Sequence, residues 1–141
     1  MVKLFIRVFM GIHVFLYRLT GGKFAGKVQG LRVLLLTGTG RKTGKLRTTP
    51  LGHFEHDGGY VIIGSNTGSD THPAWFLNLQ SNLHATIEVG DKRLEVSAEV
   101  VGPDKRNQLW ARLIELAPGY ADYAKKTSRE IPIVLLRPMK A

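Results

Sequence analysis

Residues 34–50, LLLTGTGRKTGKLRTTP, constrain the fold of this chain more than any other segment. An apolar run breaks into a glycine-rich turn with four basic residues and then resumes as a threonine-rich strand, which predicts a β-hairpin. Glycines let backbone N–H groups converge on an anion, and the basic side chains add charge-assisted hydrogen bonds. The basic residues are Arg41, Lys42, Lys45 and Arg47. Taken alone, this motif fits a phosphate site and a solvated basic turn about equally well.

The composition is that of a globular protein. The 141 residues suit one domain, 1–141, and the chain is 43% hydrophobic and 22% charged. The absence of cysteine excludes disulfides, thiolate nucleophiles and cysteine-bound metals, and it fits a reducing, cytoplasmic compartment. The five histidines have no metal-ligand spacing, so we expect no metal site.

The net charge of +9 predicts attraction to a polyanion, which could be a phosphorylated cofactor, a nucleic acid or an anionic lipid surface. A nucleic-acid-binding module is the weakest of these alternatives. The aromatic residues Phe54, Tyr60 and Trp75 are not spaced as exposed stacking platforms on a basic strand face. We therefore expect no nucleic-acid partner.

Residues 1–22 predict an amphipathic N-terminal helix with a narrow basic stripe, in which Lys3, Arg7 and Arg18 share one face with Gly11. The charges interrupt the apolar run too often for a spanning helix, and no signal-peptide cleavage site follows. Three roles stay open: packing on the domain, covering a site, or lying in an anionic membrane interface at the inner face of the cell membrane.

The rest of the chain reads as strands with a few helices. The predicted strands are 31–37, 47–54, 60–65, 83–89, 93–101 and 131–136. Two turns, 56–59 and 90–91, join neighbouring strands into hairpins. Short helices are predicted after Pro73, from Pro103 to Ala117, and around Tyr120 and Tyr123. This order predicts an α+β chain whose mainly antiparallel strands form a small barrel with peripheral helices.

Three segments in register then carry a family resemblance: TGTGRKTGKLRTTPLG, GSNTGSDTHPAWFLNLQSN and PGYADYAKKTSREIPIVLL. Together they resemble the deazaflavin-dependent nitroreductase family, small proteins that bind the reduced deazaflavin coenzyme F420. The resemblance covers residues 31–138. It implies a split β-barrel of about six mainly antiparallel strands with peripheral helices, and a cofactor-binding barrel over the same residues.

The resemblance also implies site residues. The coenzyme phosphate would lie at Arg41, Lys42 and Thr43, assisted by Arg47. The deazaflavin ring would lie beside Pro50, Leu51 and Gly52, and along Gly64, Ser65 and Asn66, where several relatives carry Lys in place of Asn66. The helix signature adds His72, Trp75 and Asn78, while Tyr120 and Tyr123 would wall the substrate pocket.

Several of these residues have a second interpretation. The Ser65 hydroxyl could instead be satisfied at a strand end, and Trp75 could serve as a core or wall residue. His72 could cap the helix or touch the coenzyme. Asn78 could bond a cofactor carbonyl or its own helix. Tyr120 and Tyr123 could simply pack.

The favoured function is transfer of a hydride from reduced deazaflavin to a small hydrophobic acceptor such as a quinone, an enone or a nitroaromatic, with Ser65, Tyr120 and Tyr123 nearest the reaction. Because the cofactor supplies the chemistry, no catalytic acid–base pair is needed. A split barrel that binds FMN is the first alternative, and a basic nucleic-acid-binding module is the second. The sequence leaves the oligomeric state open.

Overall fold

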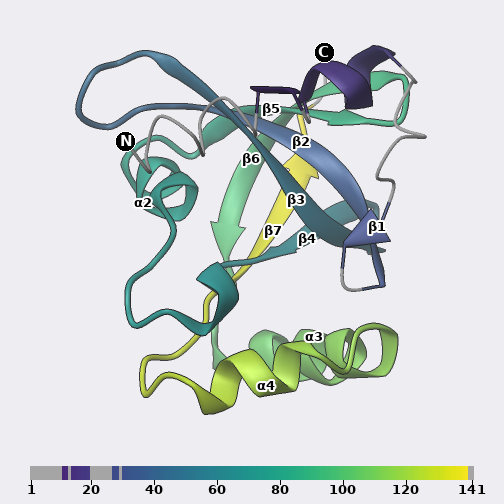
Figure 1. Ribbon diagram of the computed structural model, residues 1–141, viewed down its shortest axis with the longest axis vertical. Helices are drawn as coiled ribbons and strands as arrows, with labels where there is room; N and C mark the ends of the chain where they lie inside the picture. The colour runs from purple at the N-terminus through teal and green to yellow at the C-terminus, as the bar shows by residue number, and fades with distance from the viewer. Residues whose placement is uncertain (1–10, 13, 20–26, 29, 140–141) are drawn as a thin grey trace.

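The computed structural model describes residues 11–12, 14–19, 27–28 and 30–139. The chain forms a β-barrel with helices on its outside (Figure 1). The strands are β1 (Lys27–Val28), β2 (Leu31–Thr39), β3 (Leu46–His56), β4 (Gly59–Ile63), β5 (His84–Val89), β6 (Lys92–Val100) and β7 (Ile133–Pro138). The helices are η1 (Asn66–Gly68), α2 (Ala74–Ser81), α3 (Pro103–Leu116) and α4 (Tyr120–Lys125).

Six strands close the barrel. They follow the order β2-β3-β4-β7-β6-β5, and β5 pairs back onto β2, while the short β1 adds to the outer edge of β2. Every one of these pairings is antiparallel. The predicted α+β split barrel is thereby confirmed, with β1 as an element that the sequence did not predict.

Alternation along β2 explains how the barrel buries both of its faces. Leu34 and Leu36 belong to the interior cluster, whereas Val33 and Leu35 point to the outside. Successive side chains of a strand point to opposite faces, so a strand in which every residue is apolar must be covered on both faces. The N-terminal helical segment supplies the cover over Val33 and Leu35.

Helices α3 and α4 form a second layer below the barrel in Figure 1. Leu109 and Leu113 of α3 are buried against strand residues that face outward, among them Phe54 and Leu135. Tyr120 of α4 belongs to the same cluster. The outer face of these strands therefore packs on α3 and on Tyr120 of α4, and this packing positions Tyr120.

The hairpin turns agree with the sequence. Asp57 and Gly58 link β3 to β4 with φ of 55° and 78°, as a two-residue turn with two left-handed positions requires. Gly90, with φ of 61°, begins the turn between β5 and β6. The strand predicted over 60–65 ends earlier, at Ile63, because Asn66, Thr67 and Gly68 all adopt positive φ and turn the chain away.

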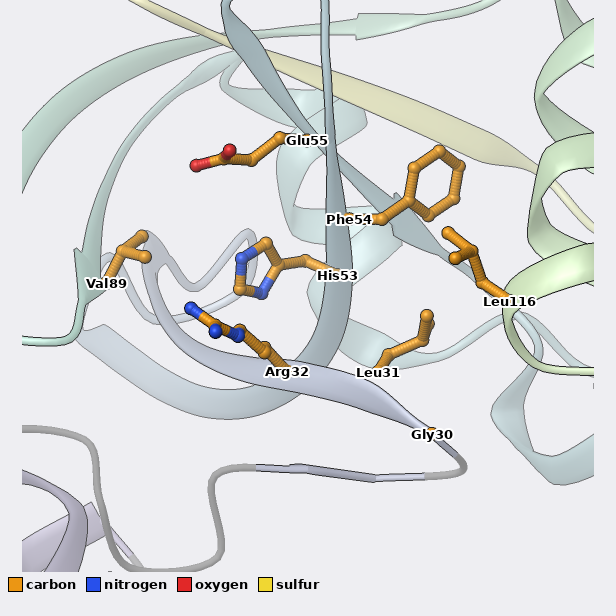
Figure 2. Close-up of a pocket in the computed structure, with 8 residues that line it drawn as sticks. All are labelled: Gly30, Leu31, Arg32, His53, Phe54, Glu55, Val89 and Leu116. Atoms are coloured by element: carbon orange, nitrogen blue, oxygen red, sulfur yellow. The ribbon is translucent and has the colours of Figure 1, made fainter.

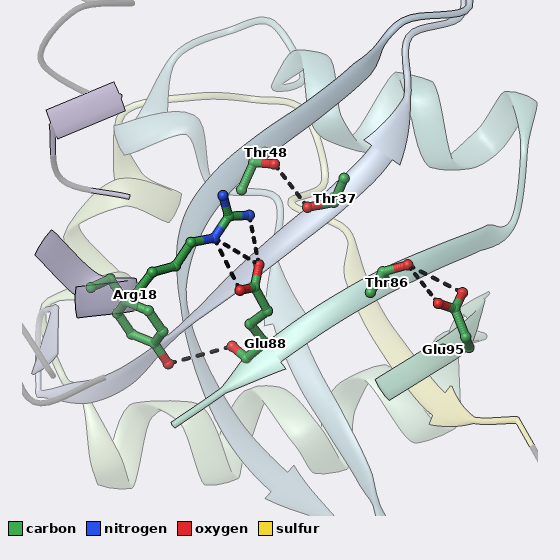
Figure 3. A network of polar contacts seen from close by, with 7 residues as sticks. Arg18, Thr37, Thr48, Thr86, Glu88 and Glu95 are labelled. Atoms are coloured by element: carbon green, nitrogen blue, oxygen red, sulfur yellow. Dashed lines mark hydrogen bonds and ion pairs between the residues drawn. The ribbon is translucent and has the colours of Figure 1, made fainter. Parts of the chain in front are cut away.

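The described N-terminal residues 11–12 and 14–19 are helical and pack on the barrel. Val14 and Tyr17 are buried over β2, and the Tyr17 hydroxyl donates to the Val33 carbonyl at 2.9 Å. Arg18 pairs with Glu88 of β5 at 2.8 Å (Figure 3). Packing on the domain is thus established for this segment; Lys3 and Arg7 of the predicted basic stripe lie outside the described residues.

The barrel is split where β3 leaves β4. The pairing of these strands runs from His56 opposite Gly59 only as far as His53 opposite Ile62. From Leu46 to Gly52, β3 pairs with β2 on one side, and none of the described strands pairs with its other side. Alternate backbone groups along this edge are therefore open to a ligand.

Candidate active site

The basic turn between β2 and β3 has a fixed backbone. The Gly40 N–H donates to the Lys45 carbonyl and the Gly44 N–H to the Gly40 carbonyl, each at 2.8 Å. Gly44 has a φ of 73°, which glycine adopts without strain. Within the described residues, the N–H groups of Lys42 and Thr43 have no protein acceptor. Two amide donors at the turn are therefore available to an anion.

No carboxylate in the described part of the chain neutralises the charge of this turn. Arg41, Lys42, Lys45 and Arg47 are all exposed. Among the described residues, none of these four side chains comes within 4.0 Å of a carboxylate. Four cations and two open amides fit a ligand with several negative charges, so this turn fits the anionic tail that the resemblance implies.

Asn78 of α2 fastens the turn to the barrel. Its Oδ1 atom accepts the Arg41 N–H at 3.1 Å and Nη1 of the Arg41 guanidinium at 3.0 Å. Asn78 is 7% exposed. The side-chain oxygen of Asn78 therefore bonds neither its own helix nor open solvent, and it orients Arg41.

Gly52 brings the split edge of β3 next to α4. A Cβ atom on Gly52 would lie 3.3 Å from the hydroxyl oxygen of Tyr120 and equally close to Cβ of Leu31, so the hydroxyl lies on the face of β3 where Gly52 has no side chain. Pro50 is half-buried on the same strand and needs no ladder donor at an open edge. Leu51 packs against the barrel interior, so its backbone rather than its side chain faces the split.

Tyr120 offers a neutral hydroxyl at this point. Burial, together with the neighbouring Tyr123, raises the pKa of Tyr120 to about 12. The two rings meet edge to face at 5.4 Å between centroids. The Tyr120 hydroxyl has no hydrogen-bond partner within the part of the chain that is described, which leaves it available to a ligand oxygen.

The loop after β4 lies against α4. Gly64 packs so tightly on Pro132 that a Cβ would come within 2.7 Å of its ring, and the Gly64 N–H donates to the Pro132 carbonyl at 2.9 Å. Asn66 uses its Nδ2 group to close the loop onto the Thr71 carbonyl at 3.0 Å. The buried Ser65 hydroxyl makes no hydrogen bond to any described residue.

Arg129 holds this loop, and our sequence reasoning gave it no role. Its guanidinium donates to the carbonyls of Gly64 (3.1 Å), Ser65 (2.9 Å) and Ser69 (2.8 Å), and Nη1 also lies 3.1 Å from Nδ1 of His72. The residue stands in the third family segment, just before the Ile131-Pro132 pair. A single arginine in an otherwise irregular stretch was the only signal that the sequence offered.

His72 and Trp75 lie at the start of α2. The His72 ring is half-buried and lies 4.9 Å from the ring of Phe76. Burial and then the charge of Arg129 lower the pKa of His72 below its ordinary value. Trp75 is partly buried against the interior cluster and meets Phe76 edge to face at 6.1 Å. Trp75 therefore contributes packing, whatever else it touches.

A separate cavity of about 450 Å³ opens at the far end of β3 (Figure 2). Its lining includes Arg32, His53, Glu55 and Val89, and none of the residues expected to bind the cofactor. His53 is 4% exposed, and its Nδ1 has no partner among the described residues. Burial lowers the pKa of His53, so its ring is neutral at physiological pH.

Comparisons with known proteins decide the family. A protein-family model described as F420H(2)-dependent quinone reductase matches residues 9–138. The chain belongs to this family. An F420H(2)-dependent quinone reductase of Mycobacterium tuberculosis is 37% identical over 129 residues, which cover 89% of this chain and 87% of the relative.

Solved structures agree with the family assignment. An F420-H2 dependent reductase has a TM-score of 0.69 and 35% identity over 74% of this chain and 93% of its own. A structure described as a domain-swapped dimer has the same TM-score and identity, and covers 74% and 79%. Family membership confirms the predicted oxidoreductase class and coenzyme F420 as the cofactor. The individual contacts with that cofactor remain predictions.

Two neighbouring regions of this chain make up the candidate F420 site. The basic turn and Asn78 lie at one end of the split, and Tyr120, Ser65 and Arg129 at the other. Figure 1 shows the hairpin turn, α2, η1 and α4 following one another along one side of the barrel. Among the described residues, no helix has the length and apolar character required to cross a membrane.

Proposed function

We propose that this chain binds reduced coenzyme F420 along the split of the barrel and reduces a quinone with it. The observation that carries this proposal is the un-neutralised basic turn adjoining the unpaired edge of β3. A site that must hold a long anionic tail and a flat polar ring needs those two features side by side.

The anionic tail is assigned to the turn. Arg41, Lys42 and Arg47 supply cationic donors, and the Lys42 and Thr43 amides supply neutral ones. Asn78 keeps Arg41 in one orientation, which lowers the entropy lost when the arginine binds an anion. Affinity at such an exposed cluster should fall as salt is added.

The ring is assigned to the split. Pro50, Leu51 and Gly52 border it on β3, and Gly64, Ser65 and Asn66 border it on the other side. When bound, the reduced deazaflavin supplies a hydride. The chain's own task is to fix the ring against the acceptor and to exclude water.

The acceptor is assigned to the side of α4. The Tyr120 hydroxyl is neutral and has no hydrogen-bond partner among the described residues, so it can donate to the oxygen that gains charge as a quinone is reduced. Ser65 directly precedes η1 and Tyr123 lies on α4, and these two elements are in contact. Aromatic walls suit a flat quinone or nitroaromatic, and the same donor would serve an enone.

We also propose that a peripheral membrane contact gives the site access to an apolar acceptor. Ile12, Phe15 and Leu19 recur at helical spacing and are 55%, 63% and 70% exposed, on the opposite side from the buried Val14 and Tyr17. Such a face is suited to the lipid interface, and the net charge of +9 favours anionic lipid. Replacing the three residues with Ser should abolish flotation with anionic vesicles, and unchanged flotation would refute this contact.

Steady-state reduction of a panel of acceptors tests the function. The panel should contain a short-chain naphthoquinone, a cyclic enone and a nitroaromatic, each with reduced F420 as donor. We expect the quinone to give the highest kcat/KM. A higher kcat/KM for the enone or the nitroaromatic would move the assignment to that acceptor. Activity with reduced FMN but not with reduced F420 would reject the deazaflavin assignment.

A further inference from the structure

Arg129 satisfies an unusual set of acceptors for a single guanidinium. Four of its contacts reach one short loop: three main-chain carbonyls, of Gly64, Ser65 and Ser69, and one imidazole nitrogen, Nδ1 of His72. No carboxylate among the described residues lies within 4.0 Å of it. Arg129 therefore acts on the shape of the loop and on the ring of His72, and not as half of an ion pair.

The contact with His72 determines where that ring carries its proton. A guanidinium has only donors and is not deprotonated in proteins, so an imidazole nitrogen 3.1 Å away must accept. The Nδ1 atom of His72 is then unprotonated, and the neutral ring carries its proton on Nε2. The same cation disfavours a second proton on the ring.

We propose that Arg129 is a positioning residue of the active site, which fixes the main chain at Ser65 and holds His72 as an Nε2–H donor. The consequence rests on the proposed function, which assigns Gly64 and Ser65 to the border of the split. Nη1 of Arg129 contacts both the Gly64 carbonyl and Nδ1 of His72, so the fixed N–H of His72 lies near that border and is suited to an oxygen of the cofactor ring or of the acceptor. Without Arg129, His72 could take either neutral tautomer, and the tautomer with its proton on Nδ1 would present the Nε2 lone pair to that oxygen.

The chain segment that carries Arg129, residues 127–131, is itself held in place. Arg106 of α3 donates to the Ile131 carbonyl at 2.9 Å through Nη2 and at 3.1 Å through Nε, and its guanidinium lies 5.2 Å from the ring of Trp110. The Thr127 hydroxyl donates to Asp70 at 2.8 Å, which adds a second tie between the segment that carries Arg129 and the loop after β4. The Arg129 guanidinium thus extends from a segment that α3 supports. A positioning residue requires such support.

Lysine should not replace Arg129. Its ammonium carries three donors on one atom, whereas the four acceptors are spread around a planar fork. Glutamine keeps a planar end but loses the charge and most of the donors. Arg129→Lys and Arg129→Gln are therefore the two informative variants. Arg112→Gln is the matched control: Arg112 lies on the exposed face of α3, and Glu115 is its only polar partner among the described residues.

The first test measures the His72 ring directly. Long-range proton–nitrogen spectra of uniformly nitrogen-15-labelled protein, without cofactor, report which imidazole nitrogen is protonated, and His72→Asn identifies the signal. We expect wild-type protein and Arg112→Gln to show Nε2–H alone at neutral pH, and both Arg129 variants to show a mixture. A protonated Nδ1 in the wild-type protein would overturn the proposal, even if neither variant folds.

The second test measures catalysis with reduced F420 and the best quinone. We expect Arg129→Lys to lower kcat by about tenfold to a hundredfold, while the Kd of the cofactor changes less than threefold. In a His72→Asn background the same substitution should cost markedly less, because Arg129 then has no tautomer to fix. Equal losses in both backgrounds would overturn the action through His72. A wild-type protein inactive on every quinone would reject the proposed acceptor, and the tautomer result would still stand.

Discussion

Arg41 donates two hydrogen bonds to one atom, Oδ1 of Asn78, with its backbone N–H at 3.1 Å and its Nη1 at 3.0 Å. The β2–β3 turn, which otherwise projects from the barrel, is fastened to α2 by this atom (Figure 1). Since Nη1 is occupied, the rest of the Arg41 guanidinium is oriented and available. The position of the cluster thus depends on a neutral, buried residue.

Asn78→Ala should therefore weaken cofactor binding without removing any charge. We expect a three- to tenfold rise in the Kd of F420, together with a loss of about 1–3 kcal/mol of stability from the unpaired Arg41 N–H. Asn107→Ala, on the exposed surface of α3, is the control and should change neither value. An unchanged Kd in Asn78→Ala would mean that Arg41 binds no anion in the orientation described.

The hydroxyls nearest the proposed acceptor should matter for turnover and not for cofactor affinity. Tyr120→Phe and Ser65→Ala should each lower kcat by about tenfold to a thousandfold, because a preorganised donor to a developing oxyanion contributes about 2–4 kcal/mol. Stopped-flow reduction of the quinone measures this step. If both variants keep full turnover on every acceptor, the proton comes from solvent and the two side chains only shape the pocket.

Trp75 and Phe76 stand next to each other but differ in burial, so they should differ in their effect on stability. Phe76 is 2% exposed in the barrel interior, and Phe76→Ala should cost about 3–5 kcal/mol of unfolding free energy. Trp75 is only partly buried, so Trp75→Ala should cost less, about 2–3 kcal/mol. Urea unfolding with an unchanged m-value measures both, and an equal or larger cost at Trp75 would contradict this order.

His53 should make the fold less stable as the pH falls. Burial lowers its pKa in the folded protein, so below the ordinary value of about 6.5 the unfolded chain binds a proton that the folded chain resists. Stability should therefore rise with pH up to about 6.5. His72, whose pKa is also lowered, contributes in the same direction.

Urea midpoints measured from pH 5 to 8 test this dependence. His53→Leu removes the titrating ring and the unpartnered Nδ1, so we expect a flatter profile below pH 6.5. His72→Asn should flatten it further in the double variant. A wild-type profile that is flat over this range, or that falls with rising pH, would show that neither ring resists protonation in the folded state.

Local sequence rules predicted the strands, the hairpin turns at Asp57-Gly58 and Gly90, and the helix that begins at Pro103, because each depends on neighbouring residues alone. The same rules identified the basic turn. They could not predict that Asn78 orients Arg41, 37 positions away, or that Arg129 reaches His72 across 57 positions. Those contacts depend on how α2 and the segment before β7 pack, which no local pattern encodes.

The N-terminal helix illustrates the same limit. Its periodicity predicted an amphipathic helix but left open which surface it would meet. Tyr17 decides the matter for the described residues, because its hydroxyl bonds the Val33 carbonyl and accepts the Gly90 N–H at 3.0 Å. Neither partner could be identified from the helix sequence.

The central claim is that the un-neutralised basic turn holds the anionic tail of F420. A spectroscopic titration of the wild-type protein and of the double variant Arg41→Ala, Lys42→Ala, with oxidised F420 and FMN side by side, tests it most directly. We expect the wild type to bind F420 more tightly than FMN, and the double variant to lose tens of fold or more in F420 affinity, since each charged hydrogen bond contributes about 1.5–3 kcal/mol. Equal or tighter FMN binding by the wild type, or unchanged F420 binding by the double variant, would contradict the claim.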